Sequence, residues 1–257
     1  MATSSIFIGL SLSVLLILPL KQWILIHIQG VAFLLTRDMR LAQWFFWLVL
    51  LPGTFLHEIS HWITANLLLV RTHRLSLWPK IRPDGWMEMG AVHMEANIDP
   101  FRHSLIGLAP LVFGTLAVLA IGQFMLGVGQ IQAILANGNV NKLVLLAIDR
   151  LTLSSTWLWL YLIFTISNSM FPSSSDRQAW RTALLYLVLI FAIPLLLGII
   201  PAIPISLQSF GLTLMTALLF AFSITLVVDL VFMGLIIFVE SILSWLMGRQ
   251  VIYNRLS

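Results

Sequence analysis

The sequence predicts an all-α polytopic membrane protein with about six transmembrane helices and a small β-hairpin. Two observations lead to this prediction. Hydrophobic residues make up 60% of the 257 residues and charged residues only 9%, whereas a soluble domain is about one quarter charged. The apolar residues also form runs long enough to cross the roughly 30 Å hydrocarbon core of a bilayer. A lipid bilayer is therefore the expected environment.

Charge and cysteine content narrow the classes of function. The formal net charge of +4 comes from basic residues between apolar runs, which is typical of a membrane topology signal rather than of nucleic-acid binding. The chain has no cysteine, so disulfides and thiolate metal sites are excluded. Any metal must be held by histidine, carboxylate and water. We expect a single integral membrane domain over residues 1–257.

The apolar runs predict the membrane helices in chain order. A first helix is expected over 6–20, and it is expected to remain uncleaved because it lacks a basic start and a small-residue cleavage signal. Lys21 interrupts this run, and 23–35 is either a second thin span or an interfacial helix. Further spans are expected over 41–70, 101–126, 151–171, 180–200 and 207–247, the last being either one long helix or two pieces.

A long polar stretch separates two of these spans. Residues 71–100 contain an alternating segment and the turn signal Arg82-Pro83-Asp84-Gly85, which together predict a β-hairpin over or in the membrane surface. Residues 127–142 are rich in Gly, Asn and Gln and are expected to form a loop. We expect a core over 41–180 and accessory transmembrane helices over 181–257.

The span over 41–70 carries the sequence His57-Glu58-Ile59-Ser60-His61. Helix positions i and i+4 share one face, so both histidines can offer a ring nitrogen to one metal ion. Zinc with an open coordination position lowers the pKa of its water to about 7, and Glu58 is placed to take the proton as a general base. Each ionisable residue near a bilayer centre costs about 2.5–3.5 kcal/mol, which favours a functional site. A paired polar cluster without metal is the alternative.

A catalytic zinc usually has three protein ligands, and Asp176 is the expected third. At 1.5 Å per residue, His57 lies about 25 Å beyond Arg40, near the opposite edge of the bilayer core. Met170 lies about 30 Å beyond Arg150 by the same rise. The two counts bring His57 and the segment before Asp176 to the same membrane edge.

Other assignments for these residues stay open. Pro172 and the serines after it end a helix, so Asp176 is expected on an extended segment, where pairing with Arg177 or Arg181 is the alternative to metal binding. The other candidates for the third ligand are polar residues of the hairpin and of the next span: His93, Glu95, Asp99 and His103.

Three ionisable residues in other apolar runs are expected to be structural. A lone His27 on an apolar face is interpreted as a hydrogen-bonded core histidine. Asp229 and Glu240 lie eleven residues apart on one helix face and are interpreted as buried partners of a basic or amide side chain.

The histidine–glutamate pattern on a membrane helix, followed two spans later by Asn168, Pro172 and Asp176, resembles the site-2 protease family of intramembrane zinc metalloproteases. In that family an Asn-x-x-Pro segment followed by Leu-Asp-Gly supplies the third zinc ligand. The resemblance covers roughly residues 41–180. It implies the following roles: zinc ligands His57, His61 and Asp176, general base Glu58, and substrate-backbone contact Asn168.

The chain departs from the family pattern at the third ligand. Pro172 stands one position late, and Ser175-Asp176-Arg177 replaces Leu-Asp-Gly, which brings a basic residue next to the expected ligand. Within these 257 residues we expect no added regulatory domain. These departures indicate a divergent, minimal member.

The expected function is hydrolysis of a peptide bond in or near a transmembrane segment of a membrane protein substrate, with one Zn²⁺ per chain and no nucleic-acid partner. The alternatives are a non-catalytic pseudoprotease or scaffold that binds transmembrane helices, and a metal-dependent hydrolase of a lipid or prenylated peptide. An intact Glu58 favours catalysis, because a binding protein has no need of it. Nine basic residues on the site's side of the spans against four on the other predict a site near the cytoplasmic face.

Overall fold

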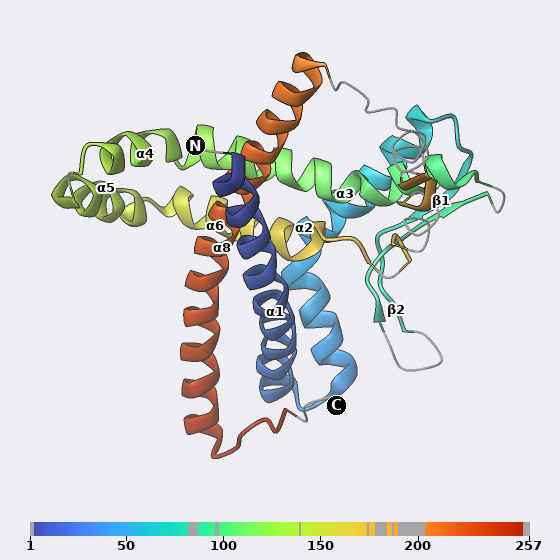
Figure 1. Cartoon of the computed structure of the whole chain (residues 1–257). Coiled ribbons are helices and arrows are strands. Elements are labelled where there is room, and N and C mark those ends of the chain that lie inside the picture. The colour runs from blue at the N-terminus through green and yellow to red at the C-terminus, as the bar shows by residue number, and fades with distance from the viewer. Residues whose placement is uncertain are drawn as a thin grey trace.

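The computed structural model of the chain describes residues 3–81, 87–95, 98–138, 140–173, 175–177, 184–186, 188–189 and 204–253. Figure 1 traces the elements in chain order. The long helices are α1 (Thr3–Thr36), α2 (Met39–Leu67), α3 (Pro100–Ala120), α6 (Ser154–Met170) and α8 (Ile205–Met247). The shorter elements are the π-helical turn η1 (Ile121–Met125), α4 (Val128–Ala136), α5 (Val140–Thr152), and the strands β1 (Thr72–Ser76), β2 (Lys80–Ile81), β3 (Met87–Glu88) and β4 (Ala91–Met94).

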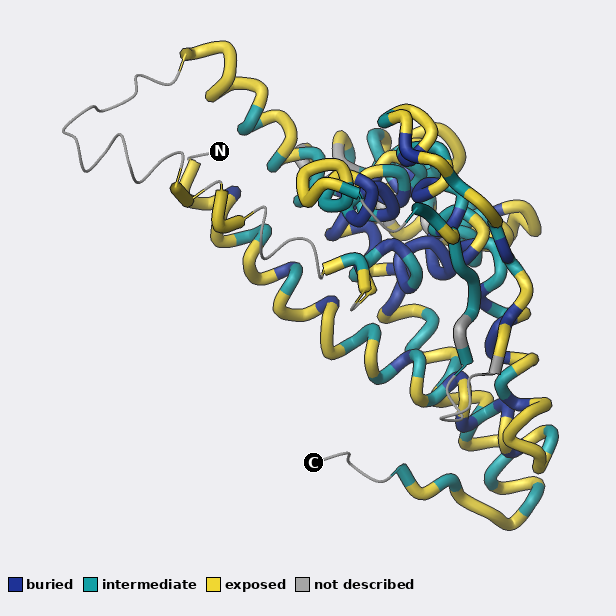
Figure 2. The backbone as a smooth tube through the Cα atoms, turned by 90° about the vertical axis from the view of Figure 1, so that its right-hand side faces the viewer, coloured by how far each residue is buried: buried dark blue, intermediate teal, exposed yellow. Residues whose placement is uncertain are grey.

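Four helices of the described part are long and apolar enough to cross a membrane: α1, α2, α3 continued by η1, and α8. Exposed apolar side chains run along α1 and α8, for example Leu15 and Phe238, as expected where a helix faces lipid (Figure 2). The predicted helical membrane fold is confirmed, but six spans are not. The expected span over 180–200 lies almost wholly outside the described residues, and the 17 residues of α6 reach only about 26 Å.

The first helix differs from its prediction. α1 is a single helix of 34 residues that continues through Lys21, so the expected interruption is wrong. In the continuous helix the Lys21 side chain lines a cavity instead of facing lipid, so the charge does not interrupt the helix. α8 is likewise one helix of 43 residues. α1 and α8 run parallel and side by side, since Gly9 lies against Leu219 and His27 against Glu240 (Figure 1).

The polar stop after α1 produces a tight reversal of the chain into α2. Arg37 takes a positive φ of 56°, and Asp38 then caps α2. Its Oδ1 accepts hydrogen bonds from the main-chain nitrogens of Arg40 (2.7 Å) and Leu41 (3.2 Å), which satisfies two donors at the start of the helix.

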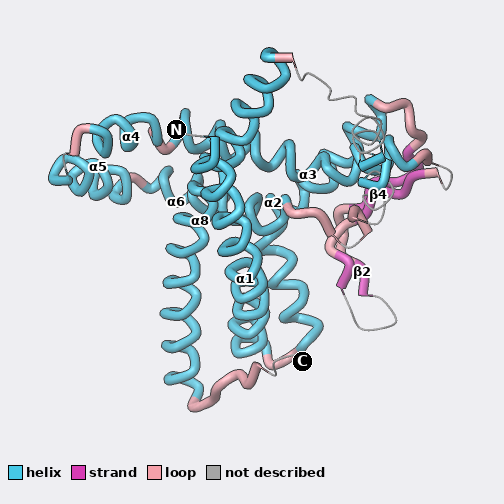
Figure 3. The backbone as a smooth tube through the Cα atoms, in the orientation of Figure 1, coloured by secondary structure: helices cyan, strands magenta, loops and turns pink. Residues whose placement is uncertain are grey.

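The predicted β-hairpin is present. β1 pairs with β4 and β2 with β3, both antiparallel, with Leu75 opposite Val92. The strands occupy one corner of the helical assembly (Figure 3), and the expected turn at 82–85 lies outside the described residues. The loop expected over 127–142 is wrong, because α4 and α5 fill most of it. Between α4 and α5, Asn137 and Gly138 form a turn, and Gly138 has a φ of 63°.

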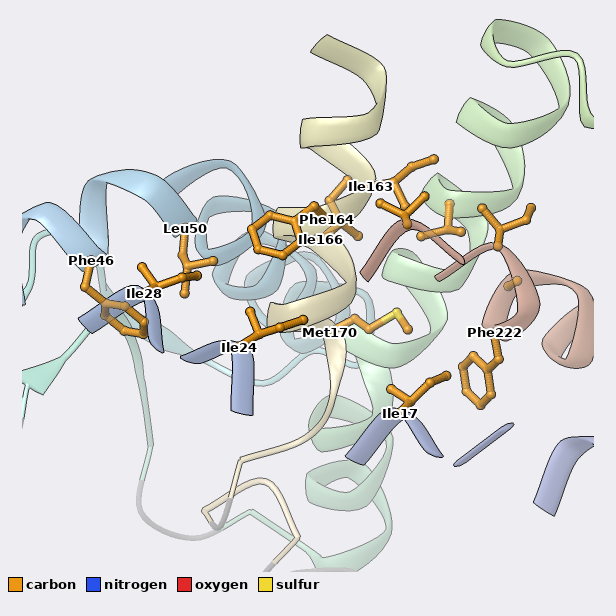
Figure 4. Packing of buried hydrophobic residues seen from close by; sticks show 14 residues of the cluster. Ile17, Ile24, Ile28, Phe46, Leu50, Ile163, Phe164, Ile166, Met170 and Phe222 are labelled. Carbon is orange, nitrogen blue, oxygen red and sulfur yellow. The ribbon is translucent and has the colours of Figure 1, made fainter. Parts of the chain in front are cut away.

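A buried apolar cluster fixes α6 against its neighbours. Ile17 and Ile24 of α1, Leu50 of α2, Phe164 of α6 and Phe222 of α8 meet in this cluster (Figure 4). These five residues come from four different helices. The cluster therefore holds the end of α6, and the segment after it, beside the second half of α2.

Candidate metal centre

His57 and His61 of α2 both direct their Nε2 atoms toward the same point in the cavity. Nδ1 of His57 lies 2.7 Å from the main-chain oxygen of Ser169, and Nδ1 of His61 lies 2.8 Å from that of Ile106. A carbonyl oxygen can only accept, so each Nδ1 carries the proton and donates it. Each Nε2 is then left with its lone pair, which is the form that binds a metal ion.

The candidate ligand atoms of His57, His61 and Asp176 lie close to one another. The two Nε2 atoms are 3.1 Å apart, and the carboxylate oxygens of Asp176 lie 3.3 Å from Nε2 of His61 and 3.7 Å from Nε2 of His57. Ligands about 2.0–2.1 Å from a tetrahedral zinc stand about 3.3 Å from one another. His57, His61 and Asp176 therefore lie close enough to hold a metal ion.

Asp176 is held in a turn rather than on the extended segment that we expected. The turn is closed by the main-chain nitrogen of Arg177 donating to the carbonyl of Ser173 at 3.2 Å. Ser173 orients the carboxylate, donating to Oδ2 from its main-chain nitrogen at 2.7 Å and from its hydroxyl at 2.6 Å. Arg177 directs Nη1 to the carbonyl of Pro172 at 2.8 Å. Arg181 lies outside the described residues.

The other candidate ligands do not join the three residues. Asp99 caps α3, accepting from the main-chain nitrogen of Arg102 at 3.0 Å and pairing with its guanidinium at 3.2 Å. His93 and His103 line the same cavity, but of the described residues only His57, His61 and Asp176 form a group of metal-binding atoms. Glu95 ends the hairpin, where its main-chain nitrogen donates to Arg71.

Glu58 lies in the cavity with the three candidate ligands. The cavity has a volume of about 1020 Å³ and is bordered by α1, α2, α3, the hairpin, and the end of α6 with the turn after it. Glu58 is only 8% exposed. The main chain of Gly90, between β3 and β4, lies directly over it, and a Cβ there would meet Oε1 at 2.9 Å. The hairpin thus covers the carboxylate that the sequence identifies as the base.

Asn168 lines the cavity, and a buried network holds its amide. Nδ2 donates to the carbonyl of Phe164 at 2.9 Å and to Oδ1 of Asp229 at 3.1 Å. Ser167 also donates to this Oδ1, at 3.0 Å. Nδ2 also lies 3.4 Å from Oγ of Ser167. The Phe164 carbonyl can only accept, which fixes the orientation of the amide. The prediction that Asp229 is a buried partner of an amide side chain is confirmed.

The same network leaves two acceptors with no partner among the described residues, Oδ1 of Asn168 and Oδ2 of Asp229. Oδ1 of Asn168 is buried, in a residue only 3% exposed, and has no hydrogen bond within the described part of the chain. The hydroxyls of Thr54 and Ser169, which also line the cavity, are likewise buried without a hydrogen-bond partner among the described residues. Buried polar atoms of this kind normally bind water or a ligand.

Sequence reasoning missed two contributors to the site. Ser173 orients Asp176 from three positions earlier, a spacing that could have indicated a side-chain-capped turn. Lys21 lines the cavity with the candidate ligands, and its Nζ lies 5.4 Å from the centre of the Phe171 ring. A lone charge in an apolar run was the signal for Lys21, since such charges rarely face lipid.

A second polar cluster lies elsewhere, between α1, α8 and the segment after α8. Nδ1 of His27 is 2.7 Å from Oε2 of Glu240, and the Tyr253 hydroxyl donates to Oε1 at 2.8 Å. Trp23 stacks on the His27 ring at 3.8 Å. Burial, together with the adjoining carboxylate, raises the pKa of Tyr253 above its ordinary value of about 10. The interpretation of His27 as a hydrogen-bonded core histidine is confirmed.

No protein-family model matches this chain, and neither does any curated protein or solved structure. The argument for function therefore depends on the residues of the cavity and their geometry.

Proposed function

We propose that this protein is an intramembrane zinc metalloprotease, of the type that the site-2 protease family represents. It would hydrolyse a peptide bond in or near a transmembrane segment. One observation carries the proposal: His57, His61 and Asp176 face one another at ligand spacing in the cavity that Glu58 also lines. A pseudoprotease or a scaffold needs no Glu58, so the intact pattern favours catalysis.

Zinc is the metal that suits this site best. Two imidazoles and one carboxylate form a ligand set of catalytic zinc sites, which keep a further position open for water or substrate. The histidines are presented in the required tautomer by two carbonyls, the arrangement that orients zinc ligands in general. When bound, zinc would supply Lewis-acid activation of water and of the substrate carbonyl.

Glu58 and Asn168 have separate roles in this proposal. Glu58 takes a proton from the attacking water and gives it to the leaving amine. Its burial under Gly90 limits access of bulk water to the carboxylate. Oδ1 of Asn168, with its Nδ2 already engaged, accepts a hydrogen bond from a main-chain N–H of the substrate.

The hairpin supplies a place for the extended substrate. A helix hides its amides, so a transmembrane substrate must unwind before cleavage. In the described sheet β4 pairs with β1 alone, and its residues Ala91–Met94 line the cavity. A substrate strand added along β4 would bring its main chain toward Glu58. Arg249, just after α8, lies beside Arg37 at the end of α1 rather than on the side of the site, so the two sides differ less in basic residues than the sequence count suggests. Arg71, Arg74 and Lys80 in the segment beside the site still support a position near the cytoplasmic face.

Metal analysis and cleavage together test the proposal. Purified in detergent without chelator, the protein should hold about one zinc per chain, and His57→Ala with His61→Ala should remove most of it. Asp176→Ala should weaken binding. Glu58→Gln should keep the zinc and lower cleavage of reconstituted single-span membrane proteins by about 10²–10⁴-fold, the usual cost of losing a general base.

The control is Glu95→Gln, which removes a carboxylate of the hairpin outside the candidate metal group and should preserve both zinc and cleavage. Stoichiometric zinc in the double histidine variant would overturn the metal site. Cleavage unchanged by Glu58→Gln would overturn hydrolysis and favour the pseudoprotease.

A further inference from the structure

Lys21 is a charged residue of the cavity that forms no ion pair with a described acid. It is the one Lys, Arg, Asp or Glu in the 34 residues of α1, and it reaches the cavity that His57 and Asp176 line. No described carboxylate lies within 4.0 Å of its Nζ, whose nearest aromatic contact is the Phe171 ring. A charge removed from bulk water without a close partner is costly, so a partner is expected.

None of the described acids near Lys21 forms an ion pair with it. Asp229 interacts with Lys21 only at longer range; its Oδ1 accepts hydrogen bonds from Ser167 and Asn168, and its Oδ2 has no hydrogen bond within the described residues. Asp176 faces the two histidines and Ser173. Arg177 adds a second positive charge close enough to Lys21 to repel it. The cavity wall beside Lys21 therefore favours an incoming anion.

We infer that Lys21 is a specificity-determining residue that binds a carboxylate of the peptide substrate, either a C-terminal α-carboxylate or an Asp or Glu side chain. This inference rests on the proposed peptidase function, which makes a peptide the expected occupant. Lysine suits the task because its ammonium is a compact point charge on a flexible stem that accepts either source of carboxylate. An apolar transmembrane segment offers few other anions.

The test measures binding rather than turnover. The parent protein is the zinc-loaded Glu58→Gln variant in phosphatidylcholine nanodiscs, so the result does not depend on whether the chain cleaves peptides. The probes are three fluorescein-labelled Leu/Ala decapeptides: one with a free C-terminal carboxylate, one with a C-terminal amide, and one amide with a central Glu. Dissociation constants are read by fluorescence anisotropy.

The parent should bind at least one carboxylate probe about 10–100-fold more tightly than the plain amide, as a charged hydrogen bond would give. The probe that gains identifies the source of the carboxylate. Lys21→Met should bring the ratio of the amide dissociation constant to the carboxylate dissociation constant to about one. Lys21→Arg should keep most of the preference for the carboxylate. The matched control Lys142→Met removes an exposed lysine of α5 and should leave the ratio unchanged.

Folding of the variant is controlled separately. Lys21→Met leaves Asp229 without its distant counter-charge, so the double variant Lys21→Met/Asp229→Asn is measured as well and should also show a ratio of about one. A preference that survives in either variant overturns the inference and assigns the carboxylate to the metal. Equal binding of the three probes by the parent, or binding of none, overturns it too. Failure of the proposed function would show instead in the zinc and cleavage assays.

Discussion

Gly107 of α3 lies against the turn that carries Asp176, and this contact predicts that Gly107→Ala will weaken the metal site. A Cβ at Gly107 would stand 2.6 Å from the main-chain oxygen of Asp176. Ordinary contact begins at 3.4 Å, so the turn must retreat by about 0.8 Å. The obstacle is main chain rather than the end of a flexible side chain, so no rotamer change relieves it.

The displacement of the turn is large enough to lower the affinity for the metal. Ligand distances at zinc sites are held to about ±0.2 Å, several times less than the movement that the methyl group demands. Residues that position ligands typically contribute 10–100-fold to affinity, and we expect a loss of this size for Gly107→Ala. Alanine is favoured over glycine inside a helix by about 0.5–1 kcal/mol, so α3 itself should form normally.

Zinc affinity is measured by competition with a chromophoric chelator, and helix content by circular dichroism. Gly211→Ala is the matched control, since a Cβ at Gly211 in α8 meets no described atom within 4 Å. The control should bind zinc as the wild type does. Wild-type zinc affinity in Gly107→Ala would refute the packing of Asp176 against α3.

Two further predictions concern topology and the second polar cluster. In this cysteine-free chain, His73→Cys in β1 should react with an impermeant maleimide only from the cytoplasmic side, and Asn137→Cys, between α4 and α5, only from the opposite side. Reversed labelling would move the site to the other face. The raised pKa of Tyr253 keeps its phenol protonated above pH 10, so the hydrogen bond to Glu240 persists until the pH exceeds the raised value. Phenolate absorbance in a wild-type minus Tyr253→Phe titration should therefore appear only above pH 10, and its appearance at or below pH 10 would contradict the contact.

Local sequence predicted much of the candidate site. Helical periodicity brings His57 and His61 to one face, which is geometry that every helix shares. Asp176 joins them as predicted, but the residue count that led to it assumed one span over 151–171. The chain instead breaks at Leu153, and α6 reaches only about 26 Å, so that count does not explain the position of Asp176.

The sequence could not predict the contacts between distant elements. Nothing local in α8 indicates that Asp229 meets Asn168, because the pairing depends on how α6 and α8 pack in three dimensions. Lys21 was misread for a related reason. A charged residue interrupts a membrane helix only if its side chain faces lipid. The direction of the Lys21 side chain depends on how α1 packs against α2 and α6, not on the residues beside Lys21 in the chain.

The contact between Asn168 and Asp229 also sets an order of events during synthesis. The two residues are 61 positions apart, and ribosomes add about 5–20 residues per second, so Asp229 is made about 3–12 s after Asn168. The candidate metal ligands all precede Asn168 or follow it closely. A nascent chain can therefore gather its metal-binding side chains before the amide that would hold a substrate has been oriented. The peptidase activity that we propose would then begin only when the last long helix has joined the others.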